Sequence, residues 1–460
     1  MRETAAGEGP RRPDTERVTR AVIWNQAIWT AGYALTTGGF LTYFGRDLGA
    51  GSMMIALLLV IPETVGIVGL AARWAIQRTG NRKRVWLISS LVARMVSLGI
   101  PLMAFPWWRG SSIDPLWMMV LCLALSQAIN SIAYVAYLSW LADLVPESRW
   151  GRFFAKRNIA KLCVLLVVPV AGGYLRDWWR QEVPPETALL AYVAAFVLGV
   201  LLLVASMLPL LRLPNVPLQA ETAVLPTWKM VGVALRDRSL RFLLLHNWWL
   251  ALANGLTQAA IFGYLFGPLA VGLGTFYVLS GVMRVVKIPT SIAAGSISDR
   301  FGNKALLFWG VLLASCAMPF WLLATPAQWW WVFGAYFVWG SFAAVNIAGR
   351  NLMLTLSPRS DNSAQIVLFR QVGGLFAGVS GFLGGWWLDS LRQAGFSIEF
   401  GTYRFEGFQL LFAVSFLGRL TAAFWILPIQ EPAARGVGWI ARALWRLRRY
   451  RFARVSHHVE

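Results

Sequence analysis

The twelve residues AAGSISDRFGNK, at positions 293–304, decide how this chain is organised, because an earlier stretch repeats them. The earlier stretch is AARWAIQRTGNR, at positions 71–82, and both contain Arg-x-Gly-Asn and end on a basic residue. Further matches follow each copy, and they are Pro146 with Pro358, Gly172-Gly173 with Gly384-Gly385, and Asp177 with Asp389. The repeat predicts that the two halves of the chain fold as two copies of one unit.

Long apolar windows surround both copies. Apolar residues make up 57% of the 460 residues and charged residues only 14%, with a mean hydropathy of +0.56, whereas a water-soluble protein carries roughly 25% charged residues. A spanning helix needs roughly 20 apolar residues to cross a hydrocarbon layer about 30 Å thick. Windows free of Asp, Glu, Lys and Arg cover residues 21–45, 115–142, 187–211, 242–283 and 305–349. The chain is therefore predicted to be a polytopic membrane protein.

Cutting the chain at charges and turn residues gives twelve expected helices, at 21–44, 52–76, 84–106, 116–142, 158–176, 188–211, 241–266, 271–297, 304–325, 328–356, 365–388 and 407–429. No sheet is expected, since an open sheet edge cannot be satisfied in lipid. The expected domains are a tail at 1–20, six-helix bundles at 21–211 and 241–429, a cytoplasmic linker at 212–240 and a basic tail at 430–460. Several transporter folds are built from such duplicated units, with the substrate near the midplane.

The net charge of +21 is distributed unevenly along the chain. Basic residues collect in both tails and in the connections on one side, while the opposite loops hold only Arg46, Arg109, Arg176, Arg180, Arg392 and Arg404. This positive-inside pattern predicts that both termini are cytoplasmic, and it accounts for the basic balance without nucleic acid. Arg outnumbers Lys by 36 to 6, which points to a GC-rich bacterial source and hence to the bacterial cytoplasmic (inner) membrane.

The chain carries no sign of a removed leader or of a metal site. Its first twenty residues are polar and are followed by a full-length span, so that span is expected to be retained. Cys122, Cys163 and Cys316 all fall inside expected spans and fit neither a metal spacing nor a disulfide framework. We expect them to pack as small apolar residues, and we expect no cofactor.

Two loops carry a family resemblance. Residues 295–304 resemble the Gly-x-x-x-Asp-Arg-x-Gly-x-basic loop signature of the major facilitator superfamily, and residues 143–152 (DLVPESRWGR) are similar to its motif after the fourth span. The resemblance implies two pseudo-symmetric six-helix bundles, with spans 1, 4, 7 and 10 lining a central cavity. The gating residues that it implies are Gln77, Arg78, Gly80, Asp143, Arg149, Arg157, Asp299, Arg300, Gly302, Lys304 and Arg370.

The first copy of the loop departs from the family pattern, because Arg73 replaces the leading Gly and Gln77 replaces the Asp. In the family's rocking mechanism, the loop Asp of each half engages the other half when the protein faces outward. We therefore predict a lopsided cytoplasmic latch, with an ion pair between Asp299 and Arg157 and only a hydrogen bond between Gln77 and Arg370. Capping of a helix end by Asp299, or a local pair with Arg300, is the alternative.

Ionisable groups inside spans are functional candidates, because each costs about 2.5–3.5 kcal/mol to insert. Glu63 in span 2 is either a proton-coupling carboxylate or the partner of Arg94 in span 3. By resemblance, Arg94 and Arg419 lie at the periphery of the fold, so we expect structural pairing or snorkelling of these two side chains.

Arg284 and Lys287 are three residues apart in span 8 and therefore share a helix face. By resemblance, span 8 borders the cavity. The pair predicts either an anion site or pairing with a carboxylate from elsewhere in the chain.

Polar side chains at helical spacing mark four expected cavity faces. The substrate-binding candidates from these faces and span 8 are Asn25, Asn130, Tyr134, Asn254, Gln258, Arg284, Lys287, Tyr336 and Asn346. An isolated Asn or Tyr more often joins helices than binds a ligand, so it is their occurrence on the four expected spans that favours a site.

The pattern as a whole predicts a secondary transporter of a small solute. An enzyme would need a nucleophile with a base, a metal cluster or paired acids, and the spans supply only one central carboxylate. The alternatives that remain open are a facilitator or exporter of neutral or hydrophobic solutes, and a non-transporting receptor or scaffold on the same fold. The expected partners are the solute, the lipid bilayer and protons as a coupling ion.

Overall fold

The computed structural model describes residues 15–105, 107, 114–144, 150–185, 187–215, 232, 235–357, 368–400 and 403–431. The N-terminal tail before residue 15, most of the linker at 212–240 and nearly all of the tail at 430–460 lie outside these residues. The predictions made for these segments therefore remain predictions.

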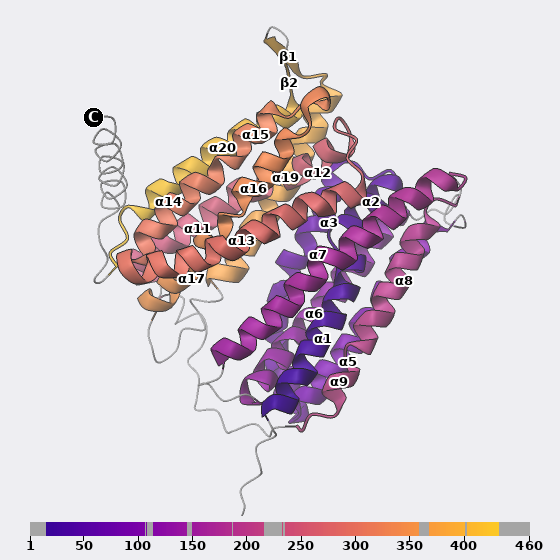
Figure 1. The fold of residues 1–460 in the computed structure, drawn as a ribbon, viewed down its shortest axis with the longest axis vertical. Coiled ribbons are helices and arrows are strands. Elements are labelled where there is room, and N and C mark those ends of the chain that lie inside the picture. The colour runs from indigo at the N-terminus through magenta and orange to yellow at the C-terminus, as the bar shows by residue number, and fades with distance from the viewer. Residues whose placement is uncertain are drawn as a thin grey trace, which may run out of the picture. The chain divides into compact units, whose positions relative to one another are not determined.

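Helices occupy every span expected in the first half (Figure 1). They are α1 (Thr15–Thr36), α2 (Gly39–Asp47), α3 (Ser52–Thr64), η1 (Val65–Leu70), α4 (Ala71–Thr79), α5 (Arg82–Ser97), η2 (Pro101–Ala104), α6 (Pro115–Leu144), α7 (Trp150–Glu182), α8 (Leu190–Ala205) and α9 (Leu208–Leu211). Helix α7 extends well beyond the expected range 158–176, because charges at its ends shorten the apolar segment without ending the helix.

The second half is helical in the same way. Its elements are α11 (Arg238–Leu256), α12 (Gln258–Phe266), α13 (Leu273–Phe301), α14 (Asn303–Ser315), α15 (Ala317–Leu323), η5 (Pro326–Gln328), α16 (Trp331–Trp339), α17 (Phe342–Leu356), the π-helix η6 (Leu368–Val372), α19 (Gly373–Gln393), α20 (Gly407–Ala422) and η7 (Ala423–Ile426).

Ten helical segments of the described chain are long and apolar enough to cross a membrane. Helices α1 and α19 occupy the remaining two expected positions. Polar residues such as Asn25, Gln26 and Thr30 make α1 less apolar than a typical span. The arrangement is consistent with twelve spans.

A two-stranded hairpin contradicts the expectation of no sheet. Strand β1 (Ser397–Phe400) pairs antiparallel with β2 (Tyr403–Glu406), with Ser397 opposite Glu406. The hairpin lies in the connection between α19 and α20, and the argument from lipid does not apply outside the spans. Glu406 then begins α20 through a capping box with Gln409.

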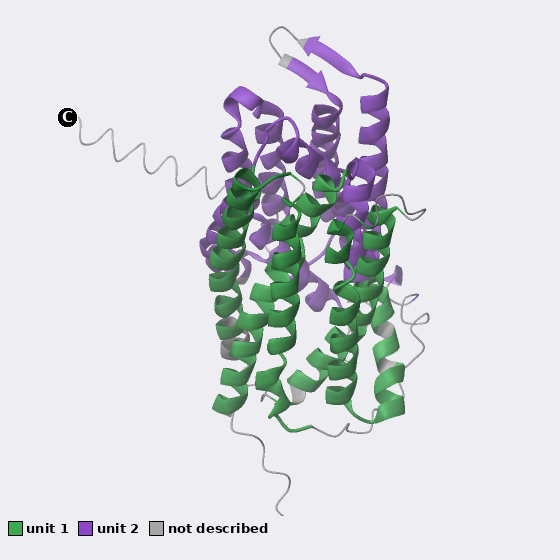
Figure 2. Ribbon diagram, turned by 90° about the vertical axis from the view of Figure 1, so that its right-hand side faces the viewer, with its two compact units in different colours: residues 1–49, 65–222, 272–277 green, residues 50–64, 223–271, 278–460 purple. Residues whose placement is uncertain are grey.

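The chain forms two compact units (Figure 2). Unit 1 comprises residues 1–49, 65–222 and 272–277, and unit 2 comprises residues 50–64, 223–271 and 278–460. Each unit thus contains a segment from the other half of the sequence: α3 belongs to unit 2, and the start of α13 belongs to unit 1. The two six-helix bundles expected at 21–211 and 241–429 therefore remain a prediction.

Glycines explain why α3 packs within unit 2. Gly374, Gly378, Gly381 and Gly385 line one face of α19, and a Cβ atom on Gly385 would approach the Met53 Cα to 2.9 Å. At Gly378 a Cβ would lie 2.8 Å from a methyl group of Val60. Small residues at this spacing let two helices approach closely. The contact therefore depends on the absence of side chains from α19.

Candidate functional site

Three of the predicted substrate contacts, Asn25, Asn130 and Tyr134, line one pocket inside unit 1. The pocket has an empty volume of about 500 Å³, part of which is open to solvent. It is formed by α1, α5, α6 and α7, and its lining residues are Asn25, Gln26, Trp29, Trp86, Ser90, Arg94, Asn130, Ala133, Tyr134, Tyr137 and Arg157.

Helical spacing brings the predicted side chains to the pocket. Asn25 and Trp29 are four residues apart on α1, as are Asn130 and Tyr134 on α6, so each pair shares a helix face. The Asn25 amide donates to the Ser206 carbonyl at 2.7 Å, and the hydroxyl of Tyr137 donates to Asn25 Oδ1 at 3.3 Å. These bonds fix the orientation of Asn25 in the wall.

Arg157, the predicted latch partner, lies in the wall of this pocket. Its Nε donates to Gln26 Oε1 at 2.6 Å, and its guanidinium carbon is 5.6 Å from the centre of the Tyr137 ring. The side chain of Asp299 lies outside the described residues, and Asp299 belongs to the other unit. The ion pair between Asp299 and Arg157 therefore remains a prediction.

Arg94 also lines the pocket, although we expected a peripheral position for it. It is 6% exposed, and its Nη1 has no hydrogen-bond partner. The described residues that line the pocket include no Asp or Glu. Its predicted partner Glu63 is exposed and belongs to unit 2. A signal was present in the sequence, because Trp86, Ser90 and Arg94 follow one another at intervals of four.

The remaining substrate candidates lie in unit 2. Asn254 Oδ1 and Gln258 Oε1 are buried without a hydrogen-bond partner, on either side of the break between α11 and α12. Tyr336 is buried and packs edge-on against Trp339. On α13, Arg284 and Lys287 are half-buried, and Asn346 on α17 is exposed.

The repeated loop places glycine where the backbone requires it. Gly80 and Gly302 have φ angles of 62° and 90°, a region that favours glycine. Lys304 Nζ donates to the carbonyls of Leu427 and Ile429. These two residues end the last span.

The equivalent residue in the first half is Lys83. Its Nζ donates to the Leu211 and Leu213 carbonyls, at the end of the sixth span. The alignment of the repeats instead sets Arg82 opposite Lys304, but Arg82 donates to the Ser139 carbonyl at 2.8 Å. The alignment is one residue out because α5 starts after Asn81 whereas α14 starts after Gly302.

Of the other gating residues, some are exposed and some lie outside the described residues. Gln77, Arg78, Arg300 and Arg370 are exposed, and Arg78 lies over the ring of Trp74. The described residues do not include Arg149, nor the side chains of Asp143 and Asp299. The predicted bond between Gln77 and Arg370 joins residues of different units and remains a prediction.

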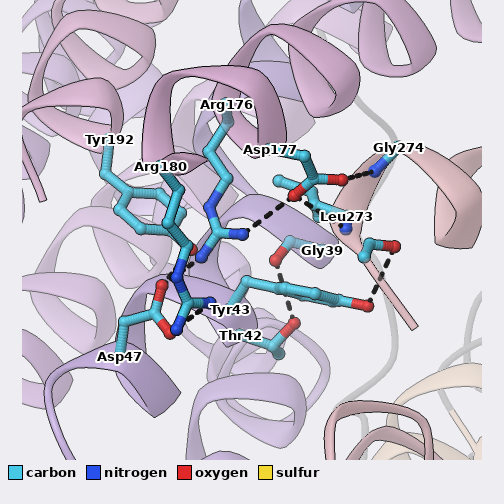
Figure 3. Close-up of polar contacts among 11 residues, drawn as sticks. Gly39, Thr42, Tyr43, Asp47, Arg176, Asp177, Arg180, Tyr192, Leu273 and Gly274 are labelled. Carbon is cyan, nitrogen blue, oxygen red and sulfur yellow. Dashed lines mark hydrogen bonds and ion pairs between the residues drawn. The ribbon is translucent and has the colours of Figure 1, made fainter. Parts of the chain in front are cut away.

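A buried charge network joins α2, α7 and α8 in unit 1 (Figure 3). Arg176 is 5% exposed, and it contacts Asp47 and donates to Asp177 Oδ1 at 2.8 Å. The Tyr192 hydroxyl donates to Asp47 at 2.7 Å, and the exposed Arg180 lies 3.5 Å from the same carboxylate. The network neutralises and positions Asp177.

Asp177 caps the start of α13. Its carboxylate accepts hydrogen bonds from the backbone N–H groups of Leu273 at 3.2 Å and Gly274 at 2.8 Å (Figure 3). Gly173, one turn earlier, permits this approach, since a Cβ there would lie 2.9 Å from the Gly274 Cα. A carboxylate at a helix N-terminus is stabilised by the N–H groups and the helix dipole.

Asp389 makes the same cap in unit 2. Its carboxylate accepts from the backbone N–H groups of Ser52 at 3.2 Å and Met53 at 3.0 Å, at the start of α3. The two caps account for the repeated motif Gly-Gly-x-x-x-Asp at Gly172–Asp177 and Gly384–Asp389. Each joins a helix from one half of the sequence to the first turn of a helix from the other half.

The family profile of the Major Facilitator Superfamily matches residues 26–378. The chain belongs to the major facilitator superfamily. It is therefore an integral membrane protein of a transporter family, and the resemblance of its loop signatures is confirmed. No curated protein matches the chain by sequence.

Solved structures of major facilitator transporters share the fold. A POT family transporter in complex with a thioalcohol-conjugated peptide has 12% identity and a TM-score of 0.67, over 90% of this chain and 96% of that chain. The nucleoside transporter NupG has 14% identity and a TM-score of 0.62, over 90% and 98%. A bacterial homologue of the iron transporter ferroportin, in an inward-facing state, gives the same four values as NupG. At these identities the likeness shows the fold alone.

Proposed function

We propose that this major facilitator protein is a secondary active transporter that moves a small organic anion across a bacterial cytoplasmic membrane by alternating access. Both termini lie in the cytoplasm in this proposal, and protons are the coupling ion. The observation that supports alternating access is the matched pair of aspartate caps. Each cap connects the two halves of the sequence through a few polar bonds to backbone groups, which can separate and reform.

The energy of these contacts suits a reversible closure. We count each cap as one charge-assisted contact, which contributes about 1.5–3 kcal/mol, so the two caps together contribute about 3–6 kcal/mol. Moving a two-state equilibrium from 1:99 to 99:1 takes about 5.5 kcal/mol. A solute and a proton that together bind one state about 10⁴-fold more tightly than the other supply this free energy.

A thermal-shift screen of the purified protein tests the solute class. The panel comprises sugars, organic carboxylates, phosphorylated metabolites and hydrophobic cations, because a ligand of the folded state raises the melting temperature with its occupancy. A compound that protects the protein should also be taken up by proteoliposomes. Protection by a neutral sugar or a hydrophobic cation, with none by organic anions, would contradict the proposal.

We propose that Arg284 and Lys287 are the cations that contact the solute. We expect Arg284→Gln and Lys287→Gln each to weaken uptake of the protective anion by about tenfold or more, since a lost charged hydrogen bond costs about 1.5–3 kcal/mol. The yield of folded protein should change far less. Equal losses of yield and uptake would assign these residues a structural role instead.

Glu63 is the proposed proton-coupling carboxylate. With Glu63→Gln, uptake driven by a pH gradient should be lost, whereas exchange of the same anion across the membrane should continue, because exchange needs no net proton movement. Both rates can be measured in one proteoliposome preparation. Loss of both activities together with a lower melting temperature would favour an ion pair with Arg94 and reject the coupling role.

A further inference from the structure

The pocket of unit 1 contains a positive charge without a counter-ion. Arg94 is nine-tenths buried, its Nη1 has no hydrogen-bond partner, and no ion pair to it is found in the described part of the chain. It also lines a second pocket, together with Tyr33 and Gln127. Removing a charge from water is costly unless the charge is paired. An unpaired guanidinium in a pocket therefore favours an anionic ligand.

Other buried arginines of this chain show what a structural role looks like. Arg419 on α20 donates to Ser415 and Thr257 and lies over the ring of Trp339 at 5.9 Å. Arg176 has two carboxylate partners. Nη1 of Arg419 also lacks a hydrogen-bond partner, so what distinguishes Arg94 is that it lines the pocket of unit 1 and, unlike Arg176, contacts no carboxylate in the described part of the chain.

We propose that Arg94 binds the carboxylate of a small organic acid, whose apolar body lies against the aromatic side chains of Trp29 and Tyr134. This inference rests on the proposed transport of an organic anion, and it adds a contact in unit 1 to those predicted on α13. A guanidinium matches a carboxylate through two parallel hydrogen bonds. Arg157 adds a second positive charge to the same wall, and Asn130 adds an amide.

The test compares organic acids with their neutral amides. Purified protein is unfolded thermally with benzoate, phenylacetate, cinnamate or indole-3-acetate, with the amide of each, and with inorganic phosphate. At least one acid should raise the melting temperature while its amide does not. Arg94→Gln should weaken binding of that acid by roughly 30-fold or more, as expected for loss of a buried charged partner.

A second variant keeps the test informative if Arg94→Gln fails to fold. Ser90 is buried, lines the pocket and precedes Arg94 by one helical turn, so Ser90→Asp supplies an internal counter-ion. This variant should be at least as stable as the parent without ligand, and it should lose the protection by the acid. As a matched control, Arg419→Gln should lower the melting temperature without ligand and leave that protection unchanged.

Several results would overturn the inference. They are equal protection by acid and amide, protection by phosphate alone, protection by no acid of the panel, and protection that persists in both Arg94→Gln and Ser90→Asp. If the acid still protects Arg94→Gln but not Arg284→Gln, transport of an organic anion stands and only the role of Arg94 is wrong. If sugars protect and acids do not, the proposed function fails as well.

Discussion

Replacing Arg176 by methionine is expected to destabilise the protein by about 3–5 kcal/mol, because removal of one partner leaves buried charges uncompensated. Arg176 is 5% exposed and stands between Asp47 and Asp177, with the rings of Tyr43 and Tyr192 on either side. Methionine keeps much of the side-chain volume and removes only the charge and the donors. Denaturant unfolding of the purified protein in detergent measures the loss.

Arg180→Met is the matched control. Arg180 lies 3.5 Å from the same Asp47 carboxylate, but its side chain is 58% exposed. An exposed ion pair contributes only about 0–1 kcal/mol. If the two variants lost similar stability, the network would not be the buried support of Asp177 that its geometry indicates.

The second large effect is expected from the double variant Asp177→Ala with Asp389→Ala. Each substitution removes a charged acceptor from two backbone N–H groups. Each should therefore raise the equilibrium constant for opening of the capped contact by tenfold or more. Cysteines placed at Ser52 and Leu273 report this opening, because both positions are buried at the capped turns. Their labelling by a water-soluble maleimide should rise roughly a hundredfold in the double variant.

Glu431 provides a control with the same chemistry. Its carboxylate caps α14 by accepting from the backbone of Asn303 at 3.0 Å and Lys304 at 2.8 Å, entirely within the second half of the sequence. Glu431→Ala should therefore lower stability without raising the labelling at Ser52 or Leu273. Unchanged labelling in the aspartate double variant would show that the caps do not control the opening.

Periodic features were the most predictable from the sequence. Cutting the chain at charges and turn residues gave helices at all twelve expected positions, because the cost of placing charges in lipid keeps every span mostly apolar. The meeting of Asn25 with Asn130 and Tyr134 also followed from spacing along two helices. The family profile confirmed the assignment that the loop motifs had indicated.

Features that depend on a neighbouring helix were not predictable. A lone charge such as Arg94 shows that its helix carries a cation, but not whether the adjacent helix covers it or leaves a pocket. Lys83 was missed because identity aligned Arg82 with Lys304, while the first turn of α5 starts one residue later. The hairpin at Ser397–Glu406 is too short to show a clear alternation.

The capping aspartates accept from peptide N–H groups, and every residue except proline carries such a group. The amino acids at 52, 53, 273 and 274 can therefore vary freely as far as the cap itself is concerned, and only proline would remove the donor. Correlated substitutions between homologues reveal contacts between two side chains. They would therefore not reveal a contact between an aspartate and backbone N–H groups. Each cap in this chain therefore depends on the identity of one aspartate, whereas any residue other than proline can serve as its partner.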